Sequence, residues 1–324
     1  MTTSFLPNAA ACLCFVLSIF AHAAEPAFPA RPIRIVIPFP PGGSTDLLAR
    51  MVGQRLTEAW GQQAVPDNRV GANGILATEI VARAAADGYT LLMNAIGHAA
   101  NASLYKKLPY DTLNDFTPVI AVADVPIFLA VHPQVKAATV KELIALAKSK
   151  PGALNCASGG VGASHHLAGE LFRQMTGTEF QHIQYKGGGP ALIELVGGRV
   201  DMMFTPVSTA LQHVKGGRLR ALAVTSPQRV AITPDLPTIA EAGVPGYESR
   251  AWYGLAGPAR MHKAVVTKLN GEIDRLLKSP DGRDKLQGLG VIPMGGSAGD
   301  FDAFIRREVE KYAKVAKAGG IRVE

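Results

Sequence analysis

Three glycine-rich turns are the segments of this sequence best suited to bind a ligand, and each lies between a strand-like run and a helical pattern. They span residues 38–46 (PFPPGGSTD), 158–164 (SGGVGAS) and 185–191 (YKGGGPA). Glycine lets the backbone approach a ligand closely, and the first turn of a helix offers unpaired N–H groups at the positive end of its dipole. Three such turns in one chain suit a ligand that carries a carboxylate at both ends.

A purely structural role accounts for each turn taken alone. Ser44 can cap the helix that follows it, with Asp46 placed to complement the helix dipole. Gly189 followed by Pro190 is the ordinary start of a helix, because proline is favoured at the first helical position. The ligand-binding interpretation therefore depends on the three turns occurring together.

The elements that position these turns alternate between short β-like runs and helical periodicity, which is the pattern of parallel sheets flanked by helices. Strands are predicted at residues 33–39, 89–94, 117–123, 127–132, 154–158, 200–204 and 220–225, with an extended segment at 248–255. Helices are predicted at 44–60, 139–148 and 165–175, and two amphipathic helices, around 265–276 and 301–312, close the chain. Pro126 and residues 245–246 are the expected crossover points between two lobes.

Length and composition restrict the class of protein. The chain has 324 residues, 48% of them apolar and 18% charged, with no low-complexity tract, so we expect one two-lobed unit or two domains. Its 33 Lys and Arg against 26 Asp and Glu give a net charge of +7, but these basic residues are spread out and only 6% of residues are aromatic. A nucleic-acid-binding surface is therefore not expected, and the charge predicts at most a mild attraction of anions.

The N-terminus has the pattern of a secretory signal peptide. The first 23 residues contain no Lys, Arg, Asp or Glu, and an apolar core at 9–20 is followed by Ala21-His22-Ala23-Ala24. The core is too short to span a bilayer, which needs about 20 residues. We therefore expect residues 1–23 to be removed near Ala23 and the remaining chain to be periplasmic, with a buried N-terminal helix or strand as the alternative.

Two features resemble enzyme nucleophiles. Residues 295–299 (GGSAG) match the nucleophile turn of serine hydrolases around Ser297, but that fold places its histidine after the serine, and the last histidine here is His262. We therefore interpret the match as a turn before the terminal helix. Cys156, the only cysteine outside the N-terminal segment, is close in sequence to His165 and His166, but a lone cysteine in a strand is more often a packing residue.

Cofactor and metal motifs are not recognisable in the sequence. Gly160-Val161-Gly162 lacks the third glycine of a dinucleotide fingerprint, and neither a Walker Gly-Lys-Ser/Thr sequence nor His-Glu-x-x-His is present. His165 and His166 are adjacent, so they point to different sides of a helix and do not form a metal pair. We expect a non-catalytic protein that needs neither a cofactor nor a metal.

A series of motifs covers nearly all of the chain after residue 23. They are residues 31–46, 68–74, 87–92, 108–111 with 115–116, 166–172, 185–187, 220–226 and 236–238. In these motifs and in their order the sequence resembles the Bug-type receptors, which are extracytoplasmic solute-binding proteins of tripartite tricarboxylate transporters.

The resemblance implies an α/β, two-lobed periplasmic-binding-protein fold of type II-like architecture, in which each lobe is a mixed sheet flanked by helices. The first lobe would comprise residues 24–126 and 248–324, and the second residues 127–247. Members of the family bind small carboxylates, including di- and tricarboxylates, acidic amino acids and aromatic carboxylates, in a cleft that closes between the lobes. The implied role is that of a monomeric receptor that delivers its ligand to a membrane permease or signals to a sensor protein.

The resemblance also implies which residues contact the ligand. Backbone N–H groups and bridging waters are expected to hold the carboxylates without an arginine clamp. Together with the third turn, this gives the candidate residues Gly42, Gly43, Ser44, Thr45, Asp46, Gly97, His98, Ser158, Gly160, Gly162, Ala163, Ser164, Gly187 and Thr205.

Two residues depart from the family pattern. Ala163 stands where relatives often have Ser or Thr, so a hydroxyl contact is missing unless Ser164 replaces it. Thr205 stands where many relatives have Asp, and without that carboxylate the ammonium group of an amino acid would lose its partner. We therefore expect a dicarboxylate or an aromatic carboxylate as the ligand, in preference to an amino acid.

Overall fold

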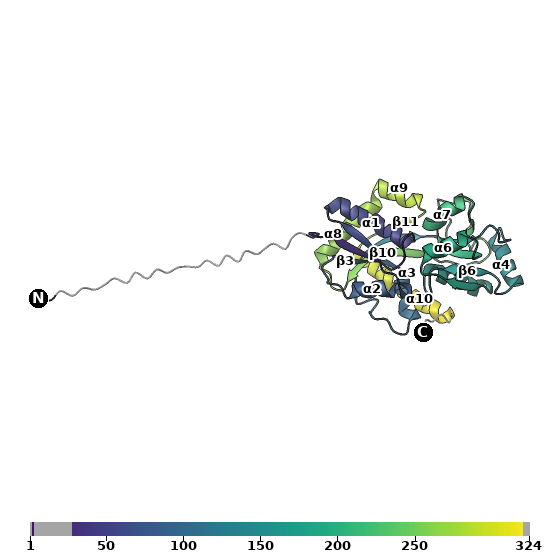
Figure 1. Cartoon of the computed structure of the whole chain (residues 1–324), viewed down its shortest axis with the longest axis horizontal. Helices are drawn as coiled ribbons and strands as arrows, with labels where there is room; N and C mark the ends of the chain where they lie inside the picture. Colours follow the sequence, from purple (N-terminus) through teal and green to yellow (C-terminus); the bar gives the residue numbers. More distant parts are fainter. Residues whose placement is uncertain (1, 3–27, 320–324) are drawn as a thin grey trace.

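The computed structural model describes residues 2 and 28–319 of the chain. Apart from residue 2, the predicted signal peptide at residues 1–23 lies outside the described residues, so its removal stays a prediction. The described chain forms two α/β units that lie side by side along the long axis of the molecule (Figure 1). Within the described chain, no helix combines the length and the hydrophobicity needed to cross a bilayer.

The first unit is built on a six-stranded sheet. Its strands are β1 (Ile33–Ile37), β2 (Ala64–Asn68), β3 (Thr90–Ala95), β4 (Phe116–Val125), β10 (Ala251–Pro258) and β11 (Ile292–Gly295). The strand order is β11-β4-β10-β3-β1-β2, in which β1, β2 and β3 run parallel and the contacts of β10 and β11 are antiparallel. The helices of this unit are α1 (Ser44–Trp60), α2 (Ile75–Ala82), α3 (Ile96–Leu104), α8 (Lys263–Lys278), α9 (Pro280–Gly288) and α10 (Ala298–Gly319), with the short 3-10 helix η1 (Ala72–Gly74).

The second unit is built on a five-stranded sheet. Its strands are β5 (Ile127–Val131), β6 (Asn155–Ser158), β7 (Gln181–Gln184), β8 (Met202–Pro206) and β9 (Arg220–Val224). The strand order is β7-β6-β8-β5-β9, in which β6 runs parallel to β7 and β8, and β5 runs antiparallel to β8 and β9. The helices of this unit are α4 (Val140–Ser149), α5 (Ser164–Thr176), α6 (Gly188–Val196) and α7 (Val207–Lys215).

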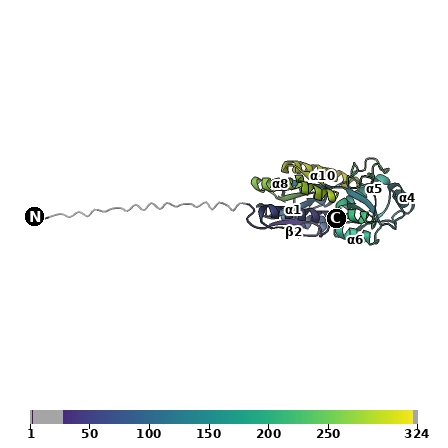
Figure 2. The same ribbon diagram turned by 90° about the horizontal axis from the view of Figure 1, so that it is seen from above.

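The chain passes between the two sheets twice. Only Pro126 separates β4 from β5, and the return runs from β9 to β10. Figure 2, seen from above, places α1 and α8 of the first unit and α4 of the second toward opposite ends of the molecule. Both sheets are mixed and flanked by helices, which confirms the predicted fold class. The exact lobe boundaries, 126/127 and 247/248, stay predictions.

The first strand and helix form because their residue patterns favour them. β1 is buried along nearly its whole length, as expected for an internal strand covered on both faces. It ends before Pro38, two residues short of the predicted end, because proline has no N–H to donate to the sheet. α1 buries Leu48, Val52 and Leu56 at helical spacing and ends at Gly61, whose φ is 67°. Strand and helix together carry the first glycine-rich turn.

Ser297 lies in the turn between β11 and α10, as predicted. Its Oγ donates a hydrogen bond to Asp300 Oδ2 at 2.7 Å and accepts one from the Asp300 N–H at 3.1 Å, so it caps the start of α10. Ser297→Ala is expected to lower the free energy of unfolding by about 1 kcal/mol and to leave ligand binding unchanged, as measured by urea denaturation and calorimetric titration. Loss of binding at full stability would contradict this structural role.

Candidate functional site

Five helices begin at the junction between the two units without a side-chain cap. They are α1, α3, α5, α6 and α7, and their N-cap residues are Gly43, Ala95, Ala163, Gly187 and Pro206. By contrast, α4, α8 and α9 are each capped by a side chain. In α7 the N–H of Val207 donates to the Pro126 carbonyl at 2.9 Å. The other first-turn N–H groups of these helices have no side-chain acceptor, and the helix dipoles favour a negatively charged one.

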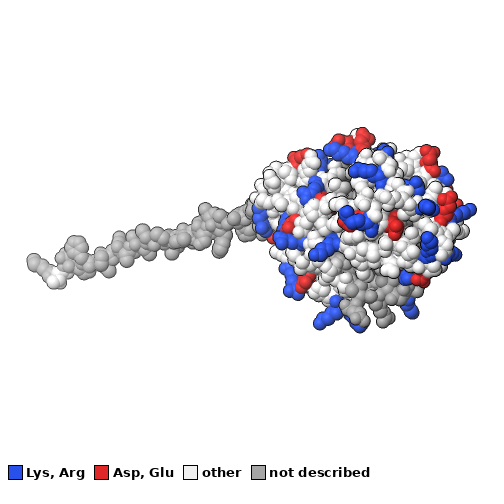
Figure 3. Space-filling view, turned by 45° about the vertical axis from the view of Figure 1, so that its right-hand side comes forward, with Lys and Arg blue, Asp and Glu red and all other residues white. Residues whose placement is uncertain are grey.

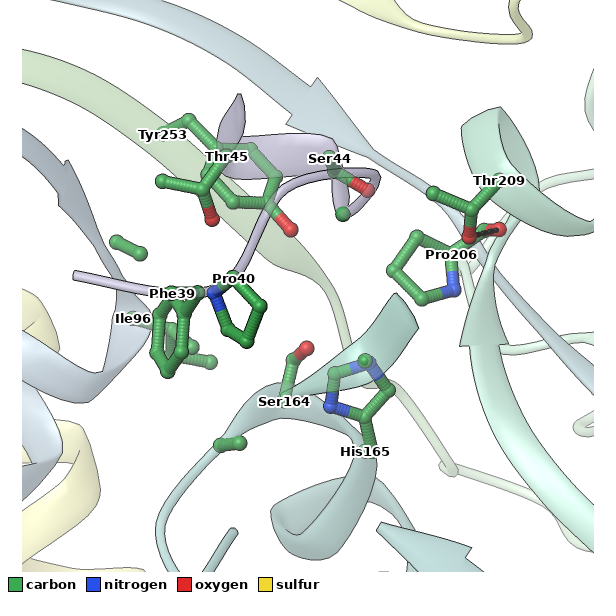
Figure 4. A pocket seen from close by; sticks show the side chains of 14 residues that line it. Phe39, Pro40, Ser44, Thr45, Ile96, Ser164, His165, Pro206, Thr209 and Tyr253 are labelled. Atoms are coloured by element: carbon green, nitrogen blue, oxygen red, sulfur yellow. Dashed lines mark hydrogen bonds between the residues drawn. The ribbon is translucent and has the colours of Figure 1, made fainter. Parts of the chain in front are cut away.

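These helix starts surround a narrow cleft between the two units, with about 30 Å³ of free space. Figure 4 shows the hydroxyl groups of Ser164 and Tyr253 pointing into this space. Among the described residues that line the cleft, none is Lys, Arg, Asp or Glu. The polar surface of the cleft consists of hydroxyls, one imidazole and backbone groups, so its attraction for an anion would come from dipoles.

Asp46 stabilises the first turn from inside the protein. Its Oδ2 accepts hydrogen bonds from the Gly42 N–H at 3.1 Å and from Arg50 Nε at 2.9 Å, and its Oδ1 accepts one from Asn68 Nδ2 at 3.1 Å. Burial alone would raise the pKa of Asp46, but the bonds from Arg50, Gly42 and Asn68 lower it overall. The carboxylate therefore stays ionised and holds the turn, and it does not line the cleft.

The second turn depends on glycine backbone geometry. Gly160 and Gly162 have φ angles of 122° and 82°, in the region that favours glycine. Ser158 Oγ donates a hydrogen bond to the Gly160 carbonyl at 3.2 Å. A Cβ at Gly162 would lie 2.5 Å from Leu104 Cδ1 in the other unit, so the turn packs directly against α3. This packing carries the start of α5 to the cleft.

The two units touch at the cleft itself. A Cβ at Gly187, the N-cap of α6, would lie 2.5 Å from Pro40 Cδ in the first turn. Ser44 Oγ at the start of α1 and Ser208 Oγ at the start of α7 lie 2.9 Å apart and share a hydrogen bond. The first and third turns, which are far apart in the sequence, therefore form one surface.

The structure brings part of the predicted site together. The predicted residues that line the cleft are Gly43, Ser44, Thr45, Ala163 and Ser164. Those next to them in the three turns are Gly42, Gly162 and Gly187. Those that lie elsewhere are Asp46, Ser158 and Thr205, which are buried, Gly160, which lines an adjoining hollow, and Gly97 and His98, which line a smaller one. The ligand contacts of all these residues stay predictions.

His98 is buried among the side chains of the first unit. Its Nε2 lies 3.1 Å from the Thr112 carbonyl oxygen, and its ring packs against Tyr110 and Phe116. Burial lowers the pKa of His98 to about 4, so the ring is neutral, and Nε2 donates to the carbonyl. Its Nδ1 has no hydrogen-bond partner among the described residues and is the atom free to accept one.

Further lining residues fall outside the predicted contact set. They are Phe39, Pro40, Ala95, Ile96, His165, Gly188, Pro206, Thr209 and Tyr253. Tyr253 of β10 pairs with Ala95 of β3, and this register brings its ring to the start of α3. Burial raises the pKa of Tyr253 to about 12, against a smaller lowering by Ser44, so its hydroxyl stays protonated and can donate to a ligand. The sequence around Tyr253 predicts an extended segment, but it does not predict the strand register that brings Tyr253 to the cleft.

Cys156 is a packing residue, as predicted. Its side chain is fully buried in β6, and burial raises the pKa of its thiol to about 12. Because the thiolate is the nucleophilic form, a thiol that stays protonated is unsuited to covalent catalysis.

Acidification between pH 6.5 and 4 is expected to destabilise the protein. Burial lowers the pKa of His98, His165 and His166 from 6.5 to about 4, so unfolding takes up protons in this range. The stability held by a histidine with a lowered pKa is fully present above pH 6.5 and is lost as the pH falls toward 4. His98→Gln is expected to reduce the proton uptake on unfolding by about one, as measured by urea unfolding across this range. An unchanged pH dependence in the variant would show that His98 titrates normally in the folded protein.

Two mixed α/β units that meet at a cleft rimmed by helix N-termini define a solute-binding receptor of the periplasmic-binding-protein type. The family model described as tripartite tricarboxylate transporter family receptor (TctC) matches residues 48–321. The chain therefore belongs to the TctC family, whose members are periplasmic receptors, and the resemblance to the Bug-type receptors is confirmed.

Individual relatives and solved structures agree with this family. The chain is 36% identical over 308 residues to Protein BugT of Bordetella pertussis, with 94% of each chain covered. It matches the structure of R. palustris Rpa4515 with adipate at a TM-score of 0.89 and 40% identity, covering 91% of this chain and 99% of that one. It matches MatC (Rpa3494) from Rhodopseudomonas palustris with bound malate at a TM-score of 0.85 and 32% identity, covering 89% of this chain and 99% of that one.

Proposed function

We propose that this protein is a periplasmic receptor that binds a small dicarboxylate or aromatic carboxylate between its two units and delivers it to a membrane permease. The observation that carries the proposal is the set of five uncapped helix starts around a cleft with no charged side chain among its described lining residues. Backbone N–H groups at helix starts bind carboxylates well without a cationic side chain. The face of the molecule in Figure 3 carries interspersed basic and acidic side chains. The helix dipoles at the cleft are therefore a more specific attraction for a carboxylate than the charge of this surface.

A dicarboxylate suits the arrangement because helix starts face the cleft from both units. α1 and α3 contribute from the first unit, and α5, α6 and α7 contribute from the second. Between them, Phe39, Ile96 and Pro206 offer apolar contacts to a hydrocarbon segment. The structures of Rpa4515 with adipate and MatC with malate support this class of ligand. An amino acid fits less well, since Thr205 and the described lining residues offer no carboxylate to its ammonium group.

Calorimetric titration of the purified protein with adipate, malate, benzoate and aspartate tests the proposal. We expect saturable binding of at least one of the first three and weaker binding of aspartate, with ligand-dependent stabilisation that follows RT ln(1 + [L]/Kd). No binding of any carboxylate, or a preference for aspartate, would overturn the proposed ligand class. Conversion of a bound ligand to product would overturn the proposal that the protein is a receptor without enzymatic activity.

Export and partner form a separate part of the proposal. We expect the protein in a periplasmic extract to begin near Ala24, as read by mass spectrometry of its N-terminus. Deletion of the gene is expected to abolish uptake of the identified carboxylate. If uptake is retained and a transcriptional response to the same carboxylate is lost, the partner is a sensor protein, which is the alternative role.

A further inference from the structure

A second cluster of polar side chains lies in the second unit between α5 and β7. His166 and Glu170 are four residues apart on α5, so they share one face of the helix, and His182 of β7 lies opposite them. The side chains of Glu170 and His182 are only 6% and 12% exposed. One potential metal-binding atom of each of the three residues lies within 4.8 Å of the others.

The cluster leaves a buried nitrogen without a partner. His182 Nε2 lies 2.8 Å from Glu170 Oε1, whereas the buried His182 Nδ1 has no hydrogen-bond partner among the described residues. Buried polar atoms nearly always have a hydrogen-bond partner or a bound ion, so an unpartnered ring nitrogen points to a missing ligand of His182. Arg173 Nη2 binds the other carboxylate oxygen, Oε2, at 2.7 Å and leaves Oε1 turned toward the histidine.

The backbone is shaped to bring these side chains together. A Cβ at Gly169 would lie 2.8 Å from His182 Cε1, so only glycine at this position lets the His182 ring approach α5. The rings of His166 and His182 are 4.7 Å apart between centroids. His165 lines the ligand cleft, whereas His166 belongs to this cluster, as expected for neighbouring residues on a helix.

We propose that His166, Glu170 and His182 form a binding site for a divalent transition-metal cation, with Zn²⁺ as the preferred ion. Two imidazoles and one carboxylate are a donor set that zinc commonly uses, whereas Mg²⁺ and Ca²⁺ prefer oxygen donors. The hydrogen bond from Arg173 orients the carboxylate in the way that outer groups orient metal ligands. The sequence shows only His-x-x-x-Glu on one helix, and the third ligand is brought in by the parallel pairing of β6 and β7.

Bound zinc would tie together two segments that lead to the ligand cleft. α5 begins with Ser164 at the cleft, and β7 runs directly into the turn that ends at Gly187. A metal that joins α5 to β7 would therefore fix the second and third turns relative to each other. The site does not depend on the identity of the carboxylate ligand, so its failure would leave the proposed receptor function untouched.

The test is titration of the full protein, first treated with a chelator and then freed of it, with Zn²⁺ alone. We expect one saturable site per chain, a higher melting temperature with Zn²⁺ and no comparable effect of Mg²⁺ or Ca²⁺. His182→Gln is expected to weaken Zn²⁺ binding by at least about tenfold, whereas the matched control His213→Gln, on α7, should bind as the unaltered protein does. Co²⁺ should give d–d absorption bands that His182→Gln loses.

Absence of saturable Zn²⁺ binding to the unaltered protein would overturn the proposal. So would equal Zn²⁺ affinity in folded His182→Gln and in the His213→Gln control. If His182→Gln does not fold, His166→Gln provides the same comparison, because it removes a ligand from the same cluster while keeping the contact between Glu170 and His182.

Discussion

Gly43→Val is expected to weaken binding of adipate or malate about 100-fold while the protein stays folded. Gly43 is the N-cap of α1 and lines the cleft, and a Cβ added there would meet no atom within 4 Å. Its φ of −86° is open to valine. The new side chain would separate the ligand from the N–H groups at the start of α1, and hydrogen bonds to a charged group contribute about 1.5–3 kcal/mol each. Calorimetric titration measures the affinity, and thermal unfolding reports the fold.

Gly271→Val is the matched control for this prediction. A Cβ at Gly271 in α8 also meets no atom within 4 Å, but Gly271 does not line the cleft. This variant is expected to bind carboxylates as the unaltered protein does. Equal losses of affinity in the two variants, or full affinity in Gly43→Val, would place the ligand away from the start of α1.

Elements with regularly spaced apolar residues could be predicted from the sequence. α1 has the predicted bounds, Ser44–Trp60, since its apolar stripe is uninterrupted and the turn before it is rich in proline and glycine. The edge strands β2 (AVPDN) and β7 (QHIQ) could not be predicted from the sequence, because most of their residues are polar or break strands. These strands form by pairing with β1 and β6. α3 (IGHAANASL) has only small and polar residues between Ile96 and Leu104, and these hide its helical period.

The candidate site could be predicted only where one segment carries the signal by itself. The three turns could be recognised by their glycines, because the backbone geometry at Gly160 and Gly187 requires glycine. Tyr253 reaches the cleft through an antiparallel register with β3, and the contact of Ser44 with Ser208 depends on how the two units meet. Such contacts join residues far apart in the chain, and no local pattern specifies them.

Gly187→Ala is expected to keep the two units apart and to weaken carboxylate binding. The added Cβ would lie 2.5 Å from Pro40 Cδ, which is closer than non-bonded atoms approach. A ligand held by helix starts from both units needs their turns to meet, so the loss of contacts from one unit should cost about tenfold to 100-fold in affinity. Small-angle scattering of the ligand-saturated protein is expected to give a larger radius of gyration for the variant than for the unaltered protein.

Pro40→Ala distinguishes this clash from strain within the turn. The φ of Gly187 is 147°, a conformation that other residues rarely adopt, so Gly187→Ala also strains its own backbone. Removal of the Pro40 ring removes the clash between the units but leaves that strain in place. If the clash is the cause, the double variant should bind more tightly than additive single effects predict, because the two substitutions act on one contact. Strictly additive effects would mean that strain in the third turn, and not separation of the units, weakens binding.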